Sequence, residues 1–292
     1  MGPLRAGDAQ LPPVDPLDAR KFHVAIRKLA DDLSYGTDRS RFLGSGIEYV
    51  QSRPYQYGDP VRAIDWRVTA RTGRVHVKDY EAPKRTPCIL LVDTSASMTL
   101  SSIARSKYAL ALHLAGGIAL ACLDRVSPVG VLGIGTREFR IQPSLSKDRI
   151  LQWLLRLRRY RFDEGTMLAR RISQLRPSLP SRSLIVVISD LHDRSGIEAL
   201  KQLGQVHDCV AIQLQDPFEV LRRGSGFLRA QEAETGRQFV THGRNEGVDV
   251  EATRASLRRA GIDHLLLRTD QPFVHRLRQF FRGRGRSASG GR

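Results

Sequence analysis

The sequence is poor in cysteine, aromatic residues and acidic residues, and each shortage excludes a class of protein. Its three cysteines, Cys88, Cys122 and Cys209, lie far apart in apolar stretches, a spacing that makes neither a zinc motif nor a disulfide framework. Aromatic residues make up 7 % of the chain and do not alternate with its basic clusters, which excludes a stacking platform for single-stranded nucleic acid. The composition fits a reducing compartment, and we expect a cytoplasmic protein.

Long hydrophobic runs are also missing. Residues 1–18 lack the apolar core of a signal peptide. The longest nearly apolar stretch, 109–123, contains His113 and two glycines and is too short to span a bilayer comfortably, since a spanning helix needs about 20 residues. We therefore expect this stretch to be a buried core helix, and we expect no transmembrane segment.

Basic residues outnumber acidic ones by 47 to 30, which gives a formal net charge of +17 at pH 7. Such a surface could attract nucleic acid, anionic lipid or an acidic protein, or it could simply be solvated. Because charge alone carries no sequence specificity, we favour the solvated surface over nucleic-acid binding. Peripheral contact with an anionic membrane stays an alternative, through the arginines of 156–161 and of the C-terminal tail.

One stretch combines a buried strand with polar side chains. Residues 88–92 are an unbroken apolar run, typical of a strand buried on both faces of a parallel sheet. Asp93, Ser95 and Ser97 follow on the loop before a long helical segment. Ligands bind at the carboxyl ends of strands in open α/β sheets, and small oxygen-bearing side chains are ligands for hard cations. This pattern predicts a magnesium-type site.

Apolar runs and helical periodicity alternate over residues 86–281, which predicts a doubly wound, mainly parallel α/β sheet of the Rossmann-like kind. The predicted strands are 88–92, 129–134, 138–141, 183–189, 209–214 and 264–267, with a hairpin of 227–230 and 237–241. The predicted helices are 17–33, 103–124, 146–158, 166–175, 196–203, 248–260 and 271–281. Gly116 and Gly117 are expected to let the second of these helices approach the sheet.

Composition divides the chain into four regions. They are an N-terminal arm and helix (1–38), a small β-rich subdomain (39–85), the α/β domain (86–281) and a basic tail (282–292) that we expect to be disordered, because it contains four arginines and no acid. In the second region we expect buried Trp66 and ion pairs of arginines with aspartates, the partners being Arg53, Arg62, Arg71, Asp59 and Asp65.

Two family resemblances rest on these residues. The order Asp93-x-Ser95-x-Ser97 resembles the metal-ion-dependent adhesion site (MIDAS) of von Willebrand factor A domains. Together with motifs before it, it resembles the family called domain of unknown function 58 (DUF58), over roughly residues 39–267. Those motifs are Tyr55-x-x-Gly58-Asp59, Ile64-Asp65-Trp66 and Ala70-Arg71.

The resemblance implies how such a site is completed. Thr166, which opens a predicted helix, and Asp190, which follows a predicted strand, match the threonine and the second aspartate of the adhesion site. By resemblance the three hydroxyls bind Mg²⁺ (or Mn²⁺ or Ca²⁺) directly and the two aspartates act mainly through water, which leaves one position for a partner's carboxylate. Each residue also has a structural interpretation, since the hydroxyls could cap helices and Asp190 could belong to a turn.

The resemblance further implies a non-enzymatic, metal-dependent protein-interaction module. Its expected role is that of an adaptor for a MoxR-type AAA ATPase, in protein complex maturation or metal-cofactor insertion. The alternative is a metal-dependent phosphohydrolase with Asp93 as nucleophile. Ser95 stands where a haloacid-dehalogenase-like enzyme needs a second aspartate, and neither a P-loop lysine motif nor a Gly-x-Ser-x-Gly elbow occurs, so we do not expect an enzyme.

Overall fold

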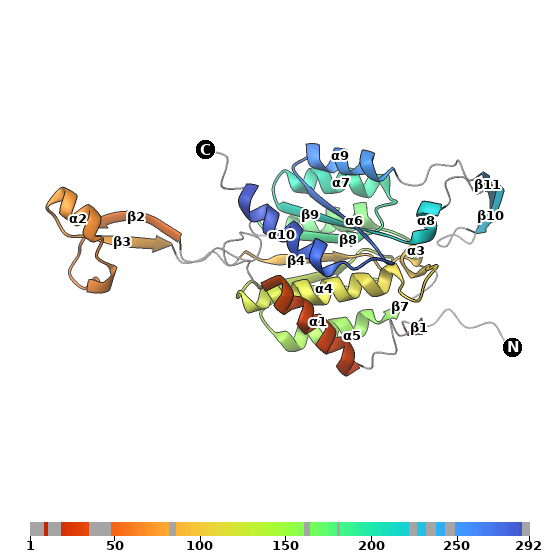
Figure 1. The fold of residues 1–292 in the computed structure, drawn as a ribbon, viewed down its shortest axis with the longest axis horizontal. Coiled ribbons are helices and arrows are strands. Elements are labelled where there is room, and N and C mark those ends of the chain that lie inside the picture. Colours follow the sequence, from red (N-terminus) through yellow and green to blue (C-terminus); the bar gives the residue numbers. More distant parts are fainter. Residues whose placement is uncertain are drawn as a thin grey trace.

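The computed structural model describes residues 9–10, 19–34, 48–81, 86–160, 164–179, 182–221, 227–231, 238–242 and 249–287. Within these residues a six-stranded sheet carries helices on both faces (Figure 1). All neighbouring strands are parallel except at one edge, where β6 runs antiparallel to β5. The predicted doubly wound, mainly parallel α/β fold is therefore confirmed.

The sheet has the strand order β12-β9-β8-β4-β5-β6. Its strands are β4 (Cys88–Val92), β5 (Val129–Gly133), β6 (Arg140–Ser144), β8 (Leu184–Ser189), β9 (Asp208–Gln215) and β12 (Asp263–Arg268). Strands β4, β5 and β8 are buried along their whole length, as continuous apolar runs predict. When the six strands are numbered in chain order and read across the sheet from β6, their order is 3-2-1-4-5-6, the pattern of doubly wound folds. The direction of winding therefore reverses between β4 and β8.

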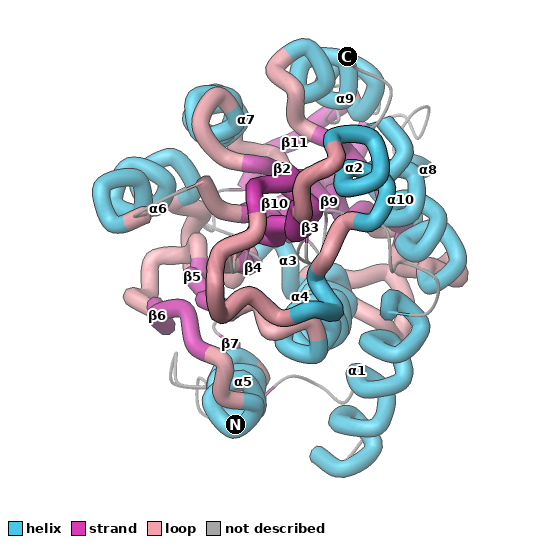
Figure 2. Tube along the Cα trace, turned by 90° about the vertical axis from the view of Figure 1, so that its left-hand side faces the viewer, coloured by secondary structure: helices cyan, strands magenta, loops and turns pink. Residues whose placement is uncertain are grey.

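Alternate side chains of β4 face two separate layers of the core. Leu90 and Val92 belong to one buried cluster, and Ile89 and Leu91 belong to the other. The helices of the first layer are α1 (Ala19–Ser34), α4 (Lys107–Asp124), α5 (Lys147–Leu157) and α10 (Val274–Ser287). Those of the second layer are α6 (Leu168–Leu175), α7 (Arg194–Gly204) and α9 (Val250–Arg259). Figure 2 shows the sheet between these two layers.

Helix α4 is the central helix of the first layer. By length and composition it could cross a membrane, but 89 % of its 18 residues are buried inside the protein. The prediction of a buried core helix is therefore confirmed. The role expected for its two glycines was wrong. A Cβ on Gly117 would lie 2.5 Å from Leu29 Cδ2, and one on Gly116 would lie 2.9 Å from Ile26 Cγ2. The glycines therefore admit α1, not the sheet, and α1 packs as part of the α/β body.

Residues 48–81 form a small unit that we call the β2–α2–β3 module. Strands β2 (Glu48–Pro54) and β3 (His76–Glu81) make the small antiparallel sheet that was predicted. Between them lie the 3₁₀ turn η2 (Val61–Ala63) and helix α2 (Trp66–Thr72). Figure 1 shows the module apart from the body, beyond the amino end of β4.

Some of the contacts predicted inside this module were wrong. The Arg53 guanidinium does bind Asp59 through two hydrogen bonds of 2.8 and 2.7 Å. Asp65, however, accepts a hydrogen bond from the Ser52 hydroxyl (2.7 Å) and caps α2, in place of pairing with an arginine. Trp66 is 67 % exposed, because it is the first residue of α2 and lies on the face of that helix turned away from the β2–β3 sheet.

The C-terminal end also differs from its prediction. Helix α10 continues to Ser287, so disorder beginning at Arg282 was wrong for residues 282–287, and 288–292 lie outside the described part. Arg284 holds this last turn to the sheet through ion pairs with Asp208 and Asp263. Strands β10 (Phe227–Gln231) and β11 (Gln238–His242) form the predicted hairpin. The short elements α3 (Ala96–Thr99), α8 (Pro217–Leu221), β1 (Ala9–Gln10) and β7 (Arg159–Tyr160) were not predicted.

Candidate metal centre

Asp93 and Asp190 follow two neighbouring strands of the sheet. Val92 at the end of β4 is paired with Ile188 near the end of β8, and the Asp93 amide donates a hydrogen bond to the Ile188 carbonyl at 3.0 Å. The loops that leave these parallel strands therefore meet at one edge. This edge is the point where the winding reverses, which is the position at which open α/β sheets bind their ligands.

The Asp93 carboxylate is completely buried. Its Oδ1 accepts a hydrogen bond from the Ser95 amide (3.0 Å), and its Oδ2 accepts one from the Ser189 hydroxyl (2.5 Å). Burial raises the pKa of Asp93 to about 6, and the negative charge of Asp190 adds to this shift although the hydroxyl donors oppose it. Two carboxylates of the same sign thus lie near each other out of water.

Asp190 is neutralised by a buried lysine that the sequence analysis did not single out. The Lys107 ammonium donates hydrogen bonds to Asp190 Oδ2 at 2.8 Å and to Glu219 Oε1 on α8 at 2.5 Å, and the lysine side chain is only 2 % exposed. Burial disfavours both charged groups, but the charges of Lys107 and His192 outweigh it and lower the pKa of Asp190. The two carboxylates likewise outweigh burial and raise the pKa of Lys107.

The hydroxyls of Ser95 and Ser97 lie between the two aspartates. The two oxygens are 3.0 Å apart, the Ser95 amide donates a hydrogen bond to Asp93 Oδ1, and the Ser97 hydroxyl helps to lower the pKa of Asp190. Ser95 is the first residue before α3, yet its side chain makes no capping hydrogen bond. The structural interpretation of Ser95 as a helix cap is therefore wrong, and its hydroxyl belongs to the aspartate cluster.

Thr166 reaches the same edge through its loop. It forms a β-bridge with Gly135 beyond the end of β5, and the Ala96 amide donates to the Glu164 carbonyl at 2.7 Å. The residue that precedes α6 is Met167, so Thr166 is not the cap of that helix. The structure thus brings together the loops of all five predicted residues, with Asp93, Ser95 and Ser97 linked by hydrogen bonds and the charge of Asp190 close enough to raise the pKa of Asp93.

The carboxylate of Glu164 holds the Thr166 loop in place. It is fully buried and accepts hydrogen bonds from the Thr94 hydroxyl (3.0 Å), the Arg137 amide (2.9 Å) and the Arg137 side chain (2.9 Å). A Cβ on Gly135 would lie 2.3 Å from Thr94 Oγ1, so only glycine fits beside this cluster. Glu164 therefore ties the loops after β4 and β5 to the Thr166 loop.

The backbone after Asp190 is strained. Leu191 has a φ of 56°, a left-handed conformation that costs a residue with a Cβ about 1–2 kcal/mol. It is held there by its own burial and by a hydrogen bond from its amide to Ser189 Oγ at 3.0 Å. Strain of this kind often occurs at functional sites, but Val126 in the turn after α4 has the same conformation (φ 60°), so Leu191 supports a site here only together with the aspartate cluster.

Sequence reasoning missed Lys107, Glu164 and Ser189 as members of this site. A signal existed for Lys107, which is the one charged residue between 107 and 123. Asp193, by contrast, caps α7 by accepting hydrogen bonds from Ser195, and it has a structural role. His192 is exposed, with its Nδ1 3.8 Å from Asp190 Oδ2.

The donor set fits a hard cation better than a soft one. Among the described residues there is no group of three or more histidine, cysteine or acidic side chains placed to hold a metal. Two carboxylates with three hydroxyls supply the oxygen ligands that Mg²⁺ prefers. Asp93, Asp190 and Glu219 carry three formal negative charges against one on Lys107, so added positive charge would be favourable here.

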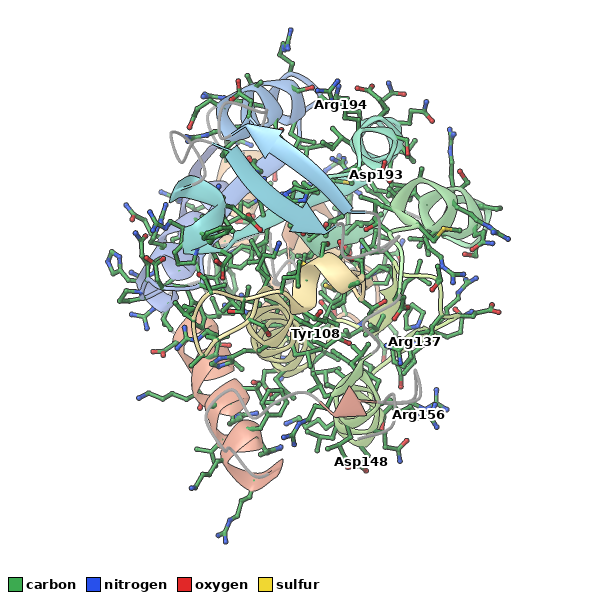
Figure 3. The ribbon with its side chains drawn as sticks, turned by 90° about the vertical axis from the view of Figure 1, so that its right-hand side faces the viewer. Tyr108, Arg137, Asp148, Arg156, Asp193 and Arg194 are labelled. Carbon is green, nitrogen blue, oxygen red and sulfur yellow. The ribbon has the colours of Figure 1, made fainter. Side chains whose placement is uncertain are left out.

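A cleft of about 450 Å³ opens beside the site loops. Its lining combines Thr94 of the first loop with two basic, one acidic and three apolar side chains, namely Arg137, Arg156, Glu138, Phe139, Leu155 and Leu157. Figure 3 shows Arg137 and Arg156 on the same side of this face of the molecule. Arg137 is paired with Glu164, so the cleft combines the charges of Arg156 and Glu138 beside the site loops.

Comparisons with known proteins give a family and some uncharacterized relatives. A family described as "Protein of unknown function DUF58" matches residues 51–264. The chain is 28 % identical over 286 residues to uncharacterized protein Mb1516 of Mycobacterium bovis and to uncharacterized protein Rv1480 of Mycobacterium tuberculosis, covering 93 % of this chain and 90 % of each relative. The crystal structure of conserved hypothetical protein BatB from Bacteroides thetaiotaomicron is similar with a TM-score of 0.45 and 16 % identity, over 69 % of this chain and 99 % of that one.

Proposed function

We propose that this chain, which belongs to the DUF58 family, binds a divalent cation at the carboxyl edge of its sheet and uses it to hold an acidic side chain of a partner protein. The observation that carries this proposal is the burial of like charges. Asp93 and Asp190 are 0 % and 2 % exposed, and Lys107 is paired with only one of them. Buried carboxylates without full compensation cost stability, so we infer that a bound cation is the missing charge.

The residues that would hold the cation follow from the adhesion-site resemblance. Ser95, Ser97 and Thr166 would bind Mg²⁺, or Mn²⁺ or Ca²⁺, through their hydroxyls, and Asp93 and Asp190 would act mainly through water. The bound cation would supply a Lewis-acidic position for one carboxylate of the partner. Ser97 and Thr166 are half-buried whereas Asp93 and Ser95 are fully buried, so we expect the partner to approach from the side of Ser97 and Thr166.

We further propose that the partner is a MoxR-type AAA ATPase or its client, and that the chain works as a cytoplasmic adaptor in complex maturation or metal-cofactor insertion. Two features support an acidic partner. The net charge of +17 would speed association with an acidic protein. Arg156, which is exposed, lines the cleft beside the site and would attract a carboxylate there.

Isothermal titration calorimetry with MgCl₂ and MnCl₂ tests the cation site. We expect saturable binding to the wild type and none to Asp93→Ala, while Asp193→Ala, which removes only the cap of α7, should bind like the wild type. A pull-down with the purified ATPase should lose its signal in EDTA and in Asp93→Ala. The absence of any binding heat in the wild type would contradict the proposal.

The same variants separate the alternatives. A phosphohydrolase would turn over p-nitrophenyl phosphate in a metal-dependent way that Asp93→Ala abolishes, whereas we propose no turnover. Binding to nucleic acid or anionic vesicles would weaken steeply with salt and would survive chelation.

A further inference from the structure

Over residues 51–79, the β2–α2–β3 module buries almost no apolar side chain. Among residues 51–79, whose side chains the structure describes, Val77 is the one apolar side chain that is buried. Five large apolar side chains of the module are exposed instead, with exposed fractions of 39 to 104 %. They are Tyr55, Tyr57, Val61, Trp66 and Val75.

This distribution is not explained by the stability of the module. A two-stranded ribbon is marginally stable in water, and apolar side chains that stay exposed do not help it fold. Exposed apolar patches instead mark contact sites for other molecules. Tryptophan, tyrosine and arginine are the residues that contribute most to binding at protein interfaces, and all three are present here.

Helix α2 presents these residues on one face. Val68 and Thr69 face the two-stranded β2–β3 sheet. Val68 is half-buried, and the Thr69 hydroxyl accepts a hydrogen bond from the His76 amide at 3.0 Å. At 3.6 residues per turn, the other side of the helix carries Trp66 and Ala70 in one row and Arg67 and Arg71 in the next. All four of these side chains are exposed. We call these four residues the outer face of α2.

Among residues 51–79 the exposed charge is mainly positive, because Asp59, Asp65 and Asp79 all make internal contacts, Asp79 in a long ion pair with Arg53 (3.9 Å). Asp59 binds Arg53. Asp65 is buried and accepts hydrogen bonds from Ser52 and from the first turn of α2. The arginines that remain on the surface are Arg62, Arg67, Arg71 and Arg74.

We propose that the outer face of α2 binds an acidic amphipathic segment of a partner protein, with an apolar side chain on Trp66 and Ala70 and carboxylates on Arg67 and Arg71. Like charge disfavours a second copy of this face as the occupant. Ala70 beside Trp66 on this face disfavours nucleic acid, because an aliphatic side chain offers no surface for base stacking. The module and the cation site lie at opposite ends of the molecule (Figure 1), so this contact is separate from the proposed function and needs no cation.

Fluorescence anisotropy with the full chain tests the proposal. The probe is a labelled helical peptide with leucine at every third or fourth position and glutamate elsewhere, and its counterpart carries glutamine for every glutamate. We expect the glutamate peptide to bind, and binding to weaken about 10-fold or more with the glutamine peptide, with Trp66→Ala, and with Arg67→Glu/Arg71→Glu. EDTA and Asp93→Ala should leave the affinity unchanged.

Matched controls and contrary outcomes make the test decisive. Phe218→Ala removes another exposed aromatic side chain, 52 % exposed, and Arg254→Glu/Arg258→Glu reverses another exposed i,i+4 pair; both should bind like the wild type. Equal binding by Trp66→Ala, or binding lost in EDTA, would overturn the proposal. So would tighter, Trp66-dependent binding of oligothymidylate, or a Trp66-dependent dimer in sedimentation equilibrium. Trp66→Ala should bind Mg²⁺ and Mn²⁺ like the wild type in calorimetry. A failure of the peptide-binding proposal can therefore be distinguished from a failure of the cation-site proposal.

Discussion

The carboxyl edge of the sheet and the β2–α2–β3 module place their residues in opposite ways. At the sheet edge Asp93 and Asp190 are 0 % and 2 % exposed, and a lysine is buried with them. In the module, the only buried ionisable side chain among residues 51–79 is Asp65, while Trp66 is 67 % exposed. One region hides charge and the other exposes apolar surface.

Both arrangements oppose the ordinary preferences of a folded chain, but they predict different partners. Buried carboxylates are stabilised by positive charge that fits a small, dry space, which a cation provides. Exposed tryptophan and valine are stabilised by covering a broad surface, which a protein segment provides. Variants that change the two regions should therefore behave differently, and stability measurements distinguish them.

Lys107→Met should have the largest effect on stability. It leaves Asp190 and Glu219 without their shared ammonium partner, and removing one member of a buried ion pair costs about 3–5 kcal/mol. Mg²⁺ should restore more stability to the variant than to the wild type, since no ammonium repels the cation. Urea unfolding in EDTA and in MgCl₂ measures both effects.

The control for this prediction is Lys147→Met. Lys147 is 56 % exposed in a long ion pair with Asp124, and exposed pairs contribute about 1 kcal/mol or less. Equal unfolding midpoints for Lys107→Met and the wild type in EDTA would show that the buried network is not needed for stability.

Acid should destabilise the body through His264, which supports the site loops. Its Nε2 lies 2.9 Å from Gln213 Oε1, and Gln213 donates to the Asp190 carbonyl. Burial, with a smaller contribution from Arg254, lowers the pKa of His264 to about 4. Because an unfolded histidine has a pKa of about 6.5, the stabilisation is complete above pH 6.5 and is lost as pH falls towards 4, by up to about 3 kcal/mol.

His264→Gln tests this pH dependence. The free energy of unfolding of the wild type should fall between neutral and mildly acidic pH by more than that of the variant. His23 is exposed on α1, so His23→Gln should follow the wild type. Parallel pH curves for the wild type and His264→Gln would contradict the assignment.

Glu164→Gln should have an intermediate effect, because it weakens the junction of the site loops. The substitution removes the charge that accepts hydrogen bonds from Thr94 and Arg137, and hydrogen bonds to charged groups contribute about 2 kcal/mol. We expect that loss in urea unfolding, together with weaker Mn²⁺ binding by calorimetry, since the Thr166 loop is held by this carboxylate. The neighbouring exposed Glu138 gives the control variant Glu138→Gln, which should change neither measurement.

The sequence predicted the sheet well because its strands have a strong signal. Continuous apolar runs such as 88–92 and 184–189 can be satisfied only in the middle of a parallel sheet, and the polar residue after each run then falls at the carboxyl edge. This reasoning alone singled out Asp93, whereas Asp190 was assigned to the site by the adhesion-site resemblance. Thr166 was located by the adhesion-site resemblance.

The errors concern residues whose environment depends on distant segments. Nothing in the sequence near Gly117 says that α1 packs there, and nothing near Lys107 says that Glu219, more than a hundred residues away, shares its ammonium. Trp66 was predicted to be buried inside the small β-rich subdomain, but burial needs a neighbouring surface, and Trp66 is 67 % exposed.

Trp66→Ala should have the smallest effect on stability, and it gives the sharpest contrast between body and module. The chain has two tryptophans, and Trp153 on α5 is 0 % exposed. Replacing a fully buried tryptophan by alanine costs about 3–5 kcal/mol, whereas an exposed site away from special features changes stability by about 0.5 kcal/mol or less. Urea unfolding of both variants should show this difference. A loss of several kcal/mol in Trp66→Ala would mean that this side chain already packs within the protein, and the outer face of α2 would then have no free tryptophan to offer a partner.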